Sequence, residues 1–157
     1  MNKSCNNLTF EDFSKKFKEE LNTWQEIENQ NGEFGIDEFI VSKGTKLGDY
    51  IEFFTNEIDM ISKIVLENEK VIGFVCYVLN KNNSVHIEMV GVNPNFRKLG
   101  YAKKILLKLK EEVIKNYSVK KVTLAVNKRN KAGINSFSKF AKETAYCSSD
   151  DYIGFEL

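Results

Sequence analysis

Apolar residues in the first sixty positions recur at helical spacing. Thr9 followed by Asp12 resembles a helix start, and the apolar residues around and after it lie three or four apart: Phe10, Phe13, Phe17, Leu21 and Trp24. A second run of this kind spans 47–58, and the glycine-bearing stretch 31–46 between the two is expected to be mostly loop. The pattern therefore predicts two N-terminal helices, with apolar faces more typical of core packing than of a ligand site.

Strand patterns replace the helical spacing after residue 60. Three apolar runs, 61–66, 71–79 and 84–92, are separated by the short polar turns 67–70 and 80–83. Because both connections are tight, the three runs predict an antiparallel meander.

Helices and strands alternate in the rest of the chain. The spacing predicts an amphipathic helix over 99–117, a strand over 121–126, a helix over 131–142, and short strands over 145–147 and 152–157. The stripe that defines the first of these helices is Ala102, Ile105, Leu106, Leu109 and Val113. The order of elements indicates a mixed α/β or α+β domain.

Composition narrows the class of protein. A chain of 157 residues with 42% hydrophobic and 29% charged residues suits one globular domain, and a net charge of +1 argues against a nucleic-acid partner. It contains no apolar run of about 18 residues, as a membrane span requires, and its polar first eight residues lack a secretion signal. Three scattered cysteines and a single histidine fit a cytoplasmic protein without a metal site.

Charge is divided unevenly along the chain. Residues 1–60 hold 13 acidic and 6 basic side chains, so residues 61–157 carry a positive excess, concentrated in 97–121. One interpretation of this division is that each region simply presents a solvated, charged face. The other is a basic region for an anionic cofactor and an acidic region for a cationic acceptor.

The basic stretch begins with a turn that joins the third predicted strand to the first amphipathic helix of the C-terminal half. The first amides of a helix have no partners within it and lie at the positive end of the helix dipole, so they bind anions when the backbone can approach closely. Gly100 has no side chain to obstruct that approach, and Ala102 keeps the next turn small. Nearby cations add attraction for phosphate: Arg97, Lys98, Lys103 and Lys104. The turn therefore predicts a diphosphate cradle.

The segment from Val92 through Pro94, Arg97 and Gly100 to Ala102 resembles the acyl-CoA motif of the GNAT superfamily of N-acetyltransferases. The segment 124–130, Leu-Ala-Val-Asn-Lys-Arg-Asn, resembles the next strand of that family and the asparagine after it. The resemblance covers about the last two-thirds of the chain. It implies a twisted, mostly antiparallel mixed sheet flanked by helices, with 1–60 as a variable acceptor-binding part and 61–157 as the acyl-CoA-binding core of one domain.

The resemblance also assigns cofactor contacts. Val90 and Val92 are expected to bind the pantetheine arm of acetyl-CoA as an added strand, with an amide near Val90 acting as the oxyanion donor. Arg97 and the amides of the turn are expected to hold the diphosphate; the residues of the turn are Lys98, Leu99, Gly100, Tyr101, Ala102 and Lys103. Asn130 is expected to support the cofactor, to cap the helix that starts at Lys131, or both.

Two polar residues on the third strand are candidates for the base. Strand alternation predicts that His86 and Glu88 share a face with Val90 and Val92, opposite an apolar face. Glu88 is the first candidate for taking the proton of the acceptor amine and His86 the second, and a solvated or structural role remains open for both.

The position of the general acid, which protonates the departing thiolate, departs from the family pattern. Phe137 stands where many members have the tyrosine that protonates the departing thiolate, and it is expected instead to form an apolar wall at the pantetheine end. Three explanations stay open: the thiolate needs little help, another donor replaces the tyrosine, or the protein binds CoA without efficient transfer. The replacement donors are Ser136, Ser138, Tyr146 and water.

These observations predict an acetyl-CoA-dependent N-acetyltransferase that acts by direct attack of an amine, without an acyl-enzyme on Cys76 or Cys147. The acceptor is expected to be a small-molecule or peptide amine, and the acidic N-terminal third indicates a cationic one, such as a polyamine, an aminoglycoside-like molecule or a peptide amine. The protein is expected to be a monomer or homodimer. The alternative is a non-catalytic acyl-CoA sensor, which Phe137 motivates. A nucleic-acid module on the basic helix lacks an aromatic stacking set.

Overall fold

The computed structural model describes residues 7–31 and 46–157, with side chains throughout except for 25–31. The chain begins with strand β1 (Leu8–Asp12), a 3-10 turn (Lys15–Phe17) and helix α1 (Lys18–Asn31), and continues after the gap with helix α3 (Leu47–Glu57). Both predicted N-terminal helices are confirmed. The predicted loop 31–46 lies almost entirely outside the described residues.

The predicted helix start at Thr9 and Asp12 is wrong, because these residues belong to β1. Leu8 is buried, Thr9 is exposed and Phe10 is half-buried, which is the two-residue alternation of a strand. β1 pairs antiparallel with β2, and Asp12 forms an ion pair with Lys63 at 2.5 Å. Tertiary pairing along the sheet edge therefore decides the structure of this segment.

The predicted meander is confirmed as β2 (Ile61–Glu67), β3 (Lys70–Asn80) and β4 (Ser84–Val92). A 3-10 turn (Pro94–Phe96) leads to the long helix α4 (Tyr101–Tyr117) and then to β5 (Lys121–Asn127). These bounds lie within one residue of the predicted ones, except that α4 begins two residues later than predicted.

The C-terminal elements differ from the predicted ones in length or in position. Helix α5 (Lys131–Ser138) ends four residues before the predicted end, where the amides of Lys139 and Phe140 bond to carbonyls three residues back, at 3.4 and 3.1 Å, and tighten the last turn. The strand predicted over 145–147 is replaced by β6 (Lys142–Thr144), after which the chain turns away and returns as β7 (Tyr152–Glu156). The hydroxyl of Ser148 closes that turn by donating to the carbonyl of Thr144 at 2.7 Å.

The strands form one seven-stranded sheet in the order β1-β2-β3-β4-β5-β7-β6. Every neighbouring pair is antiparallel except β4 and β5. The fold is therefore a mixed, mostly antiparallel sheet flanked by helices, as predicted.

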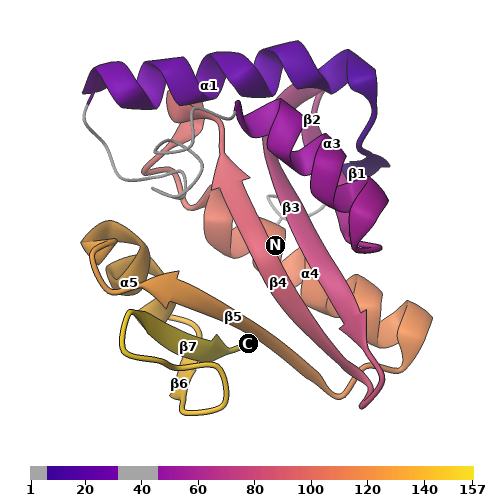
Figure 1. The fold of residues 1–157 in the computed structure, drawn as a ribbon, viewed down its shortest axis with the longest axis vertical. Coiled ribbons are helices and arrows are strands. Elements are labelled where there is room, and N and C mark those ends of the chain that lie inside the picture. Colours follow the sequence, from indigo (N-terminus) through magenta and orange to yellow (C-terminus); the bar gives the residue numbers. More distant parts are fainter. Residues whose placement is uncertain (1–6, 32–45) are drawn as a thin grey trace.

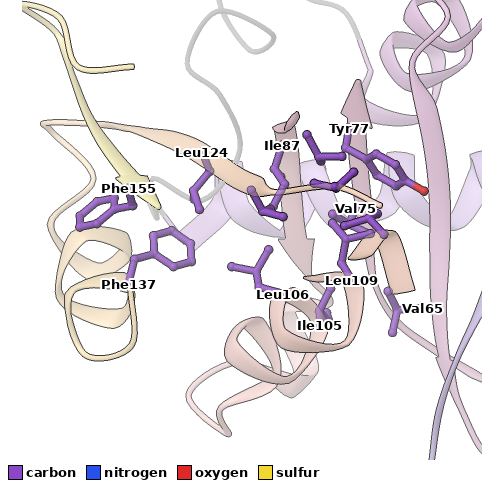
Figure 2. Packing of buried hydrophobic residues seen from close by; sticks show 14 of the residues in the cluster. Val65, Val75, Tyr77, Ile87, Ile105, Leu106, Leu109, Leu124, Phe137 and Phe155 are labelled. Carbon is purple, nitrogen blue, oxygen red and sulfur yellow. The ribbon is translucent and has the colours of Figure 1, made fainter. Parts of the chain in front are cut away.

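Helices α4 and α5 cover one face of the sheet and build the larger core, whose side chains come from all of the long strands (Figure 2). Helices α1 and α3 cover the other face and build the second core on β2 and β3. Figure 1 shows α1 and α3 over β2–β4, with α4 on the far side of the sheet and β5–β7 extending beyond α1 and α3. The α1/α3 face of β5 is thus free of helices among the described residues.

Helix α5 begins at a side-chain cap. Asn130 accepts a hydrogen bond from the amide of Gly133 at 2.9 Å through its side-chain oxygen. This confirms the predicted capping role of Asn130, because one of the orphan donors of the helix is satisfied by its side chain.

We expect Leu106→Ala to destabilise the fold by about 2–5 kcal/mol, because Leu106 is fully buried under the sheet and its loss leaves a cavity. Urea unfolding measures the free energy of unfolding. Leu107→Ala is the matched control, since Leu107 is 42% exposed on the same helix and its loss is expected to change stability by less than about 0.5 kcal/mol. Equal losses in the two variants contradict the described orientation of α4.

We expect Asn130→Ala to lower stability by about 0.5–2 kcal/mol through loss of the cap, whereas Asn130→Asp keeps an acceptor at the cap and most of the stability. Thermal unfolding of the three proteins provides the comparison. If the aspartate variant is as unstable as the alanine variant, the cap is not what the side chain contributes.

Candidate active site

The parallel contact between β4 and β5 is short. The two strands pair from Ser84 to Ile87 on β4, opposite Lys121 to Leu124 on β5. Beyond this point β4 stays paired with β3 and β5 stays paired with β7, so the strands diverge (Figure 1). One edge of β4 from Met89 to Val92 is consequently left without a strand partner in the described part of the chain.

A β-bulge lies where the divergence begins. Met89 is opposite Cys76 and Ile87 is opposite Tyr77, so Glu88 is the extra residue that no residue of β3 faces. A bulge inserts one residue into the alternation and reverses the faces beyond it.

The predicted face of Glu88, Val90 and Val92 is therefore corrected. Val90 and Val92 pack against the α4 core, the same core that holds Val85 and Ile87, whereas Met89 packs against the α1/α3 core. By strand alternation His86 lies on the α1/α3 face, opposite Ile87. His86 and the two valines thus lie on opposite faces of β4.

The diverging part of β4 is supported from β3 by an aromatic side chain. Gly91 is the register partner of Phe74, and a side chain at Gly91 would collide with the Phe74 ring. The same ring stacks on Trp24 of α1, with 6.3 Å between ring centroids. Gly91 therefore allows a contact that connects β4 to the N-terminal helices.

The turn between β4 and α4 adopts left-handed backbone conformations at two positions. Lys98 has φ +64° and Gly100, the N-cap of α4, has φ +81°. Lys104 is the first residue of α4 whose amide bonds back, to the carbonyl of Gly100 at 3.3 Å. The amides of 101–103 precede it and have no partner in the helix, so this end of α4 has the form of an anion-binding nest.

The side chains around the turn fix its position. Arg97 donates from Nε to the carbonyl of Val92 at 3.3 Å, and Tyr101 donates its hydroxyl to Glu67 at 3.0 Å. Asn93 is buried and donates to the carbonyl of Val71 at 3.0 Å. Arg97 thus anchors the turn to the end of β4, a role that the sequence did not indicate, and Lys98, Leu99, Gly100 and Lys103 are exposed.

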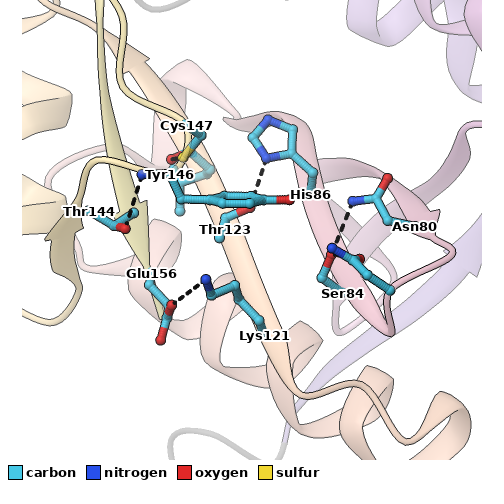
Figure 3. Close-up of polar contacts among 11 residues, drawn as sticks. Asn80, Ser84, His86, Lys121, Thr123, Thr144, Tyr146, Cys147 and Glu156 are labelled. Carbon is cyan, nitrogen blue, oxygen red and sulfur yellow. Dashed lines mark hydrogen bonds and ion pairs between the residues drawn. The ribbon is translucent and has the colours of Figure 1, made fainter.

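A side-chain hydrogen bond of His86 crosses the parallel pair. Its Nδ1 lies 2.9 Å from the hydroxyl oxygen of Thr123, its register partner on β5 (Figure 3). Thr123 is 1% exposed. A threonine in the otherwise apolar segment Val-Thr-Leu-Ala-Val was the signal that could have marked it, but sequence reasoning missed it.

The other two predicted catalytic residues are Glu88 and Tyr146, and Phe137 is the predicted apolar wall at the pantetheine end. Glu88 is exposed, and its negative charge acts on the buried Cys76. Tyr146 is 55% exposed and packs its ring 4.5 Å from Nζ of Lys121. Phe137 is buried in the α4 core between Phe140 and Phe155, with ring centroids 5.9 and 6.2 Å away.

Both described cysteines are poorly suited to nucleophilic attack. Burial raises the pKa of the Cys76 thiol to about 12, and burial also raises the pKa of the half-buried Cys147 thiol. The thiolate is the reactive form, so neither thiol is activated near neutral pH.

Metal-binding clusters and membrane-spanning helices are both absent from the described residues. Over 7–31 and 46–157, no group of three or more His, Cys, Asp or Glu side chains is arranged to hold a metal ion. In the same ranges no helix has the length and apolar character needed to cross a bilayer.

The fold matches solved acetyltransferases at low sequence identity. Spermidine N-acetyltransferase SpeG from Vibrio cholerae, in complex with CoA and spermine, has a TM-score of 0.67 at 13% identity, covering 96% of this chain and 95% of that chain. PaiA N-acetyltransferase from Thermoplasma acidophilum, in complex with coenzyme A, has a TM-score of 0.68 at 16% identity, with 95% and 97% covered. A GNAT-family acetyltransferase from Staphylococcus aureus gives the same score, identity and coverage.

In sequence, the chain matches a family model but no individual curated protein. No curated protein matches the chain in sequence. The model of the acetyltransferase (GNAT) family matches residues 12–141, which is most of the chain and includes the diverging strands and the turn before α4. The chain therefore belongs to the acetyltransferase (GNAT) family, and the predicted enzyme class, an acyltransferase, is confirmed.

Proposed function

We propose that this protein transfers the acetyl group of acetyl-CoA directly to an amine. The single observation that carries the proposal is the unpaired edge of β4 from Met89 to Val92, which leads directly to the anion-binding turn at the start of α4. An extended arm with a diphosphate at one end suits this arrangement, since a strand edge offers amides and carbonyls and a helix N-terminus offers amides to phosphate.

The residues fit coenzyme A in three respects. Val90 and Val92 lie on the edge that would bind the pantetheine arm, and an amide near Val90 would polarise the thioester carbonyl. The amides of 98–103 and the adjacent cationic side chains would hold the diphosphate. No hydrogen bond within the described residues uses those amides, and Gly100 leaves open space beside them.

The reaction is an aminolysis. The lone pair of the neutral acceptor amine attacks the thioester carbonyl carbon, the C–S bond then breaks, and the sulfur leaves as a thiolate. An alkylamine has a pKa of about 10.4, so it is mostly protonated near neutral pH. A base must therefore accept the proton that the amine loses. Direct attack is favoured over an acyl-enzyme because the pKa of Cys76 lies at about 12.

Glu88 remains the first candidate for the base and His86 the second. Glu88 is exposed at the bulge, next to the point where β4 leaves β5. His86 lies two residues earlier, where the strands still pair. Both side chains are close in sequence to the proposed oxyanion donor, so either one, directly or through water, can receive the proton of the amine.

We propose that a general acid is either not needed or is supplied by a residue other than the tyrosine usual in the family. Phe137 packs in the core and has no proton to donate. A thiol has a pKa of about 8.5, so the thiolate can leave without a proton from a general acid. Tyr146, Ser136 and water remain proposed donors. Ser138 already donates its hydroxyl to the carbonyl of Ile134 at 2.7 Å.

The proposed acceptor is a small-molecule or peptide amine, and a polycation is favoured within that class. The support is the acidic excess of residues 1–60 and the fold match to a spermidine N-acetyltransferase. Part of that acidic charge is used internally, because Asp49 and Glu52 of α3 pair with Lys18 of α1 at 2.7 and 3.3 Å. The exposed carboxylates of α1 and its surroundings are left to attract a cation.

We extend the proposal to the organisation of the chain. Residues 1–60 supply the acceptor side and 61–157 the acyl-CoA side of a single domain, because α1 and α3 lie over the sheet face opposite α4 (Figure 1). A cytoplasmic location and a monomeric or homodimeric state stay proposals, the first supported by the scattered cysteines.

The proposed function is tested by thiol release from acetyl-CoA with a panel of polyamines, aminoglycosides and peptide amines. We expect turnover with at least one amine of the panel. Binding of CoA by calorimetry without turnover of any amine supports the sensor alternative. Absence of both binding and turnover at millimolar CoA contradicts the proposal.

We expect Gly100→Val to weaken CoA binding, because a β-branched side chain disfavours φ +81° and turns the amides of the cradle away from the diphosphate. Calorimetry measures the Kd for CoA. Ser118→Val is the matched control, because Ser118 has φ +53° at the far end of the same helix and its substitution adds similar strain. Unchanged CoA affinity in the folded Gly100 variant refutes the cradle.

We expect Glu88→Gln to lower kcat by about 10²–10⁴-fold, the usual contribution of a general base, while the Kd for CoA stays unchanged. Steady-state kinetics and calorimetry separate the two effects. Glu111→Gln, an exposed carboxylate of α4, is expected to keep the wild-type rate. A wild-type rate in the Glu88 variant removes Glu88 from the mechanism.

A further inference from the structure

The turn before α4 holds part of its backbone in an unfavourable conformation. Lys98 has φ +64° and Gly100 has φ +81°. Glycine enters this left-handed region at little cost, but a residue with a Cβ atom, such as Lys98, is strained there. Strained backbone of this kind persists only where the surrounding structure fixes it. The turn therefore needs contacts with other elements to keep its amides oriented.

The entrance of the turn is fixed to the first residues of β3. The amide of Asn93 donates to the carbonyl of Ile72 at 2.7 Å, and its side-chain nitrogen donates to the carbonyl of Val71 at 3.0 Å. The side-chain oxygen of Asn93 accepts from the amide of Asn95 at 3.0 Å. A buried side chain with both polar ends bonded thus holds the chain where it leaves β4.

The exit of the turn is fixed to the last residue of β2. Tyr101, the first residue of α4, donates its hydroxyl to Oε1 of Glu67 at 3.0 Å, a charge-assisted bond. Burial, with the bond to Glu67 and its charge, raises the pKa of this hydroxyl, which stays a donor near neutral pH. The Tyr101 ring is also held, because Phe96 meets it edge-on with 6.0 Å between centroids, and Nζ of Lys104 lies 5.1 Å from its centroid.

Both anchors belong to one tight hairpin, formed by β2 and β3. Glu67 pairs with Lys70 at its end, and the two residues between them, Asn68 and Glu69, have φ +51° and +66°. Two left-handed residues are what a type I′ turn requires, and this turn matches the twist of paired strands. Glu67 precedes the hairpin turn, and the carbonyls that bind the entrance follow it within a few residues. One hairpin therefore holds both ends of the turn before α4.

We propose that Glu67 is a positioning residue for the diphosphate of acetyl-CoA and acts through the hydroxyl of Tyr101. The bond between them holds the first turn of α4 so that the amides of 101–103 stay directed at the anion. The inference rests on the proposed function, which assigns the diphosphate to this turn. A carboxylate does not itself attract a diphosphate, so the contribution of Glu67 is indirect.

Loss of the exit anchor is expected to appear in the affinity for CoA. Without the bond to Glu67, the backbone at Lys98 can leave the left-handed region, and a smaller fraction of the unliganded protein has a competent turn. The apparent Kd of a ligand rises in inverse proportion to that fraction. The thioester is proposed to lie along β4, away from the anchor, so kcat is expected to stay unchanged. The contacts of Asn93 remain in every variant below.

Tyr101→Phe removes the hydrogen bond and keeps the ring with its contact to Phe96. We expect calorimetry to show a Kd for CoA that is about two- to tenfold higher, the range that one hydrogen bond commonly contributes. Glu67→Ala is expected to bind CoA more weakly than Glu67→Gln, which keeps an oxygen acceptor. Both Glu67 variants lose the same charge, so their difference reports on the hydrogen bond. Tyr117→Phe, at the exposed far end of α4, is expected to bind like wild type.

A second background tests whether the anchor works by holding strained backbone. Lys98→Gly removes the strain at φ +64° and also one cation, so it weakens CoA binding by itself. We expect the further change Tyr101→Phe to raise the Kd by a smaller factor in this background than in the wild-type one, because less strain is left to hold. Equal factors in the two backgrounds contradict the proposal. A wild-type Kd in Tyr101→Phe, or equal affinities in the two Glu67 variants, overturns the role of Glu67.

Two further measurements separate positioning from general loss of structure and from failure of the proposed function. We expect Tyr101→Phe to lower kcat/KM with acetyl-CoA but not with S-acetylpantetheine, which has the thioester and no diphosphate; an equal loss with both overturns the proposal. In the unliganded protein, the amide of Lys104, the first bonded amide of α4, is expected to exchange faster in Tyr101→Phe than in wild type. Unchanged exchange refutes the anchor. Faster exchange in a protein that binds no CoA refutes the proposed function and leaves the anchor established.

Discussion

The structure depends on one short parallel pairing. β4 and β5 share only the register from Ser84 to Ile87, and every other strand contact in the sheet is antiparallel. A parallel neighbour must be reached through a crossover, which here is α4. The helix therefore starts at the end of β4, close to where the two strands separate. A single topological requirement thus brings a free strand edge and a helix N-terminus to the same place.

The two faces of the sheet divide the work of stabilising this site. The α4 face is filled by one continuous apolar core, which fixes β4, β5 and the helix relative to one another. Among the described residues, helices cover the opposite face over β2–β4 but not over β5, and the hydrogen bond between His86 of β4 and Thr123 of β5 lies at this boundary. A buried polar pair is stabilising only when its bonds are complete.

Much of the fold was predictable because local patterns and tertiary structure agree. The meander, the amphipathic α4 and the turn at Gly100 were identified from spacing and glycine placement. The errors arose where long-range contacts decide: β1 is a strand because β2 offers it an edge, and the bulge at Glu88 is visible only in the register with β3. The bulge also explains why strand alternation placed Val90 on the wrong face. Thr123 escaped notice because a threonine in a strand is ordinary until its partner across the sheet is known.

The aromatic contact beneath Gly91 links regions that differ in role. The Phe74 ring lies against the backbone of Gly91 on one side and stacks on Trp24 of α1 on the other. The helix that is proposed to line the acceptor side cannot shift far without repacking this ring, and the ring supports the strand edge proposed for the thioester arm. The acceptor and the thioester arm are proposed to bind to elements that share this one phenyl group, so on that proposal the two binding sites are mechanically linked.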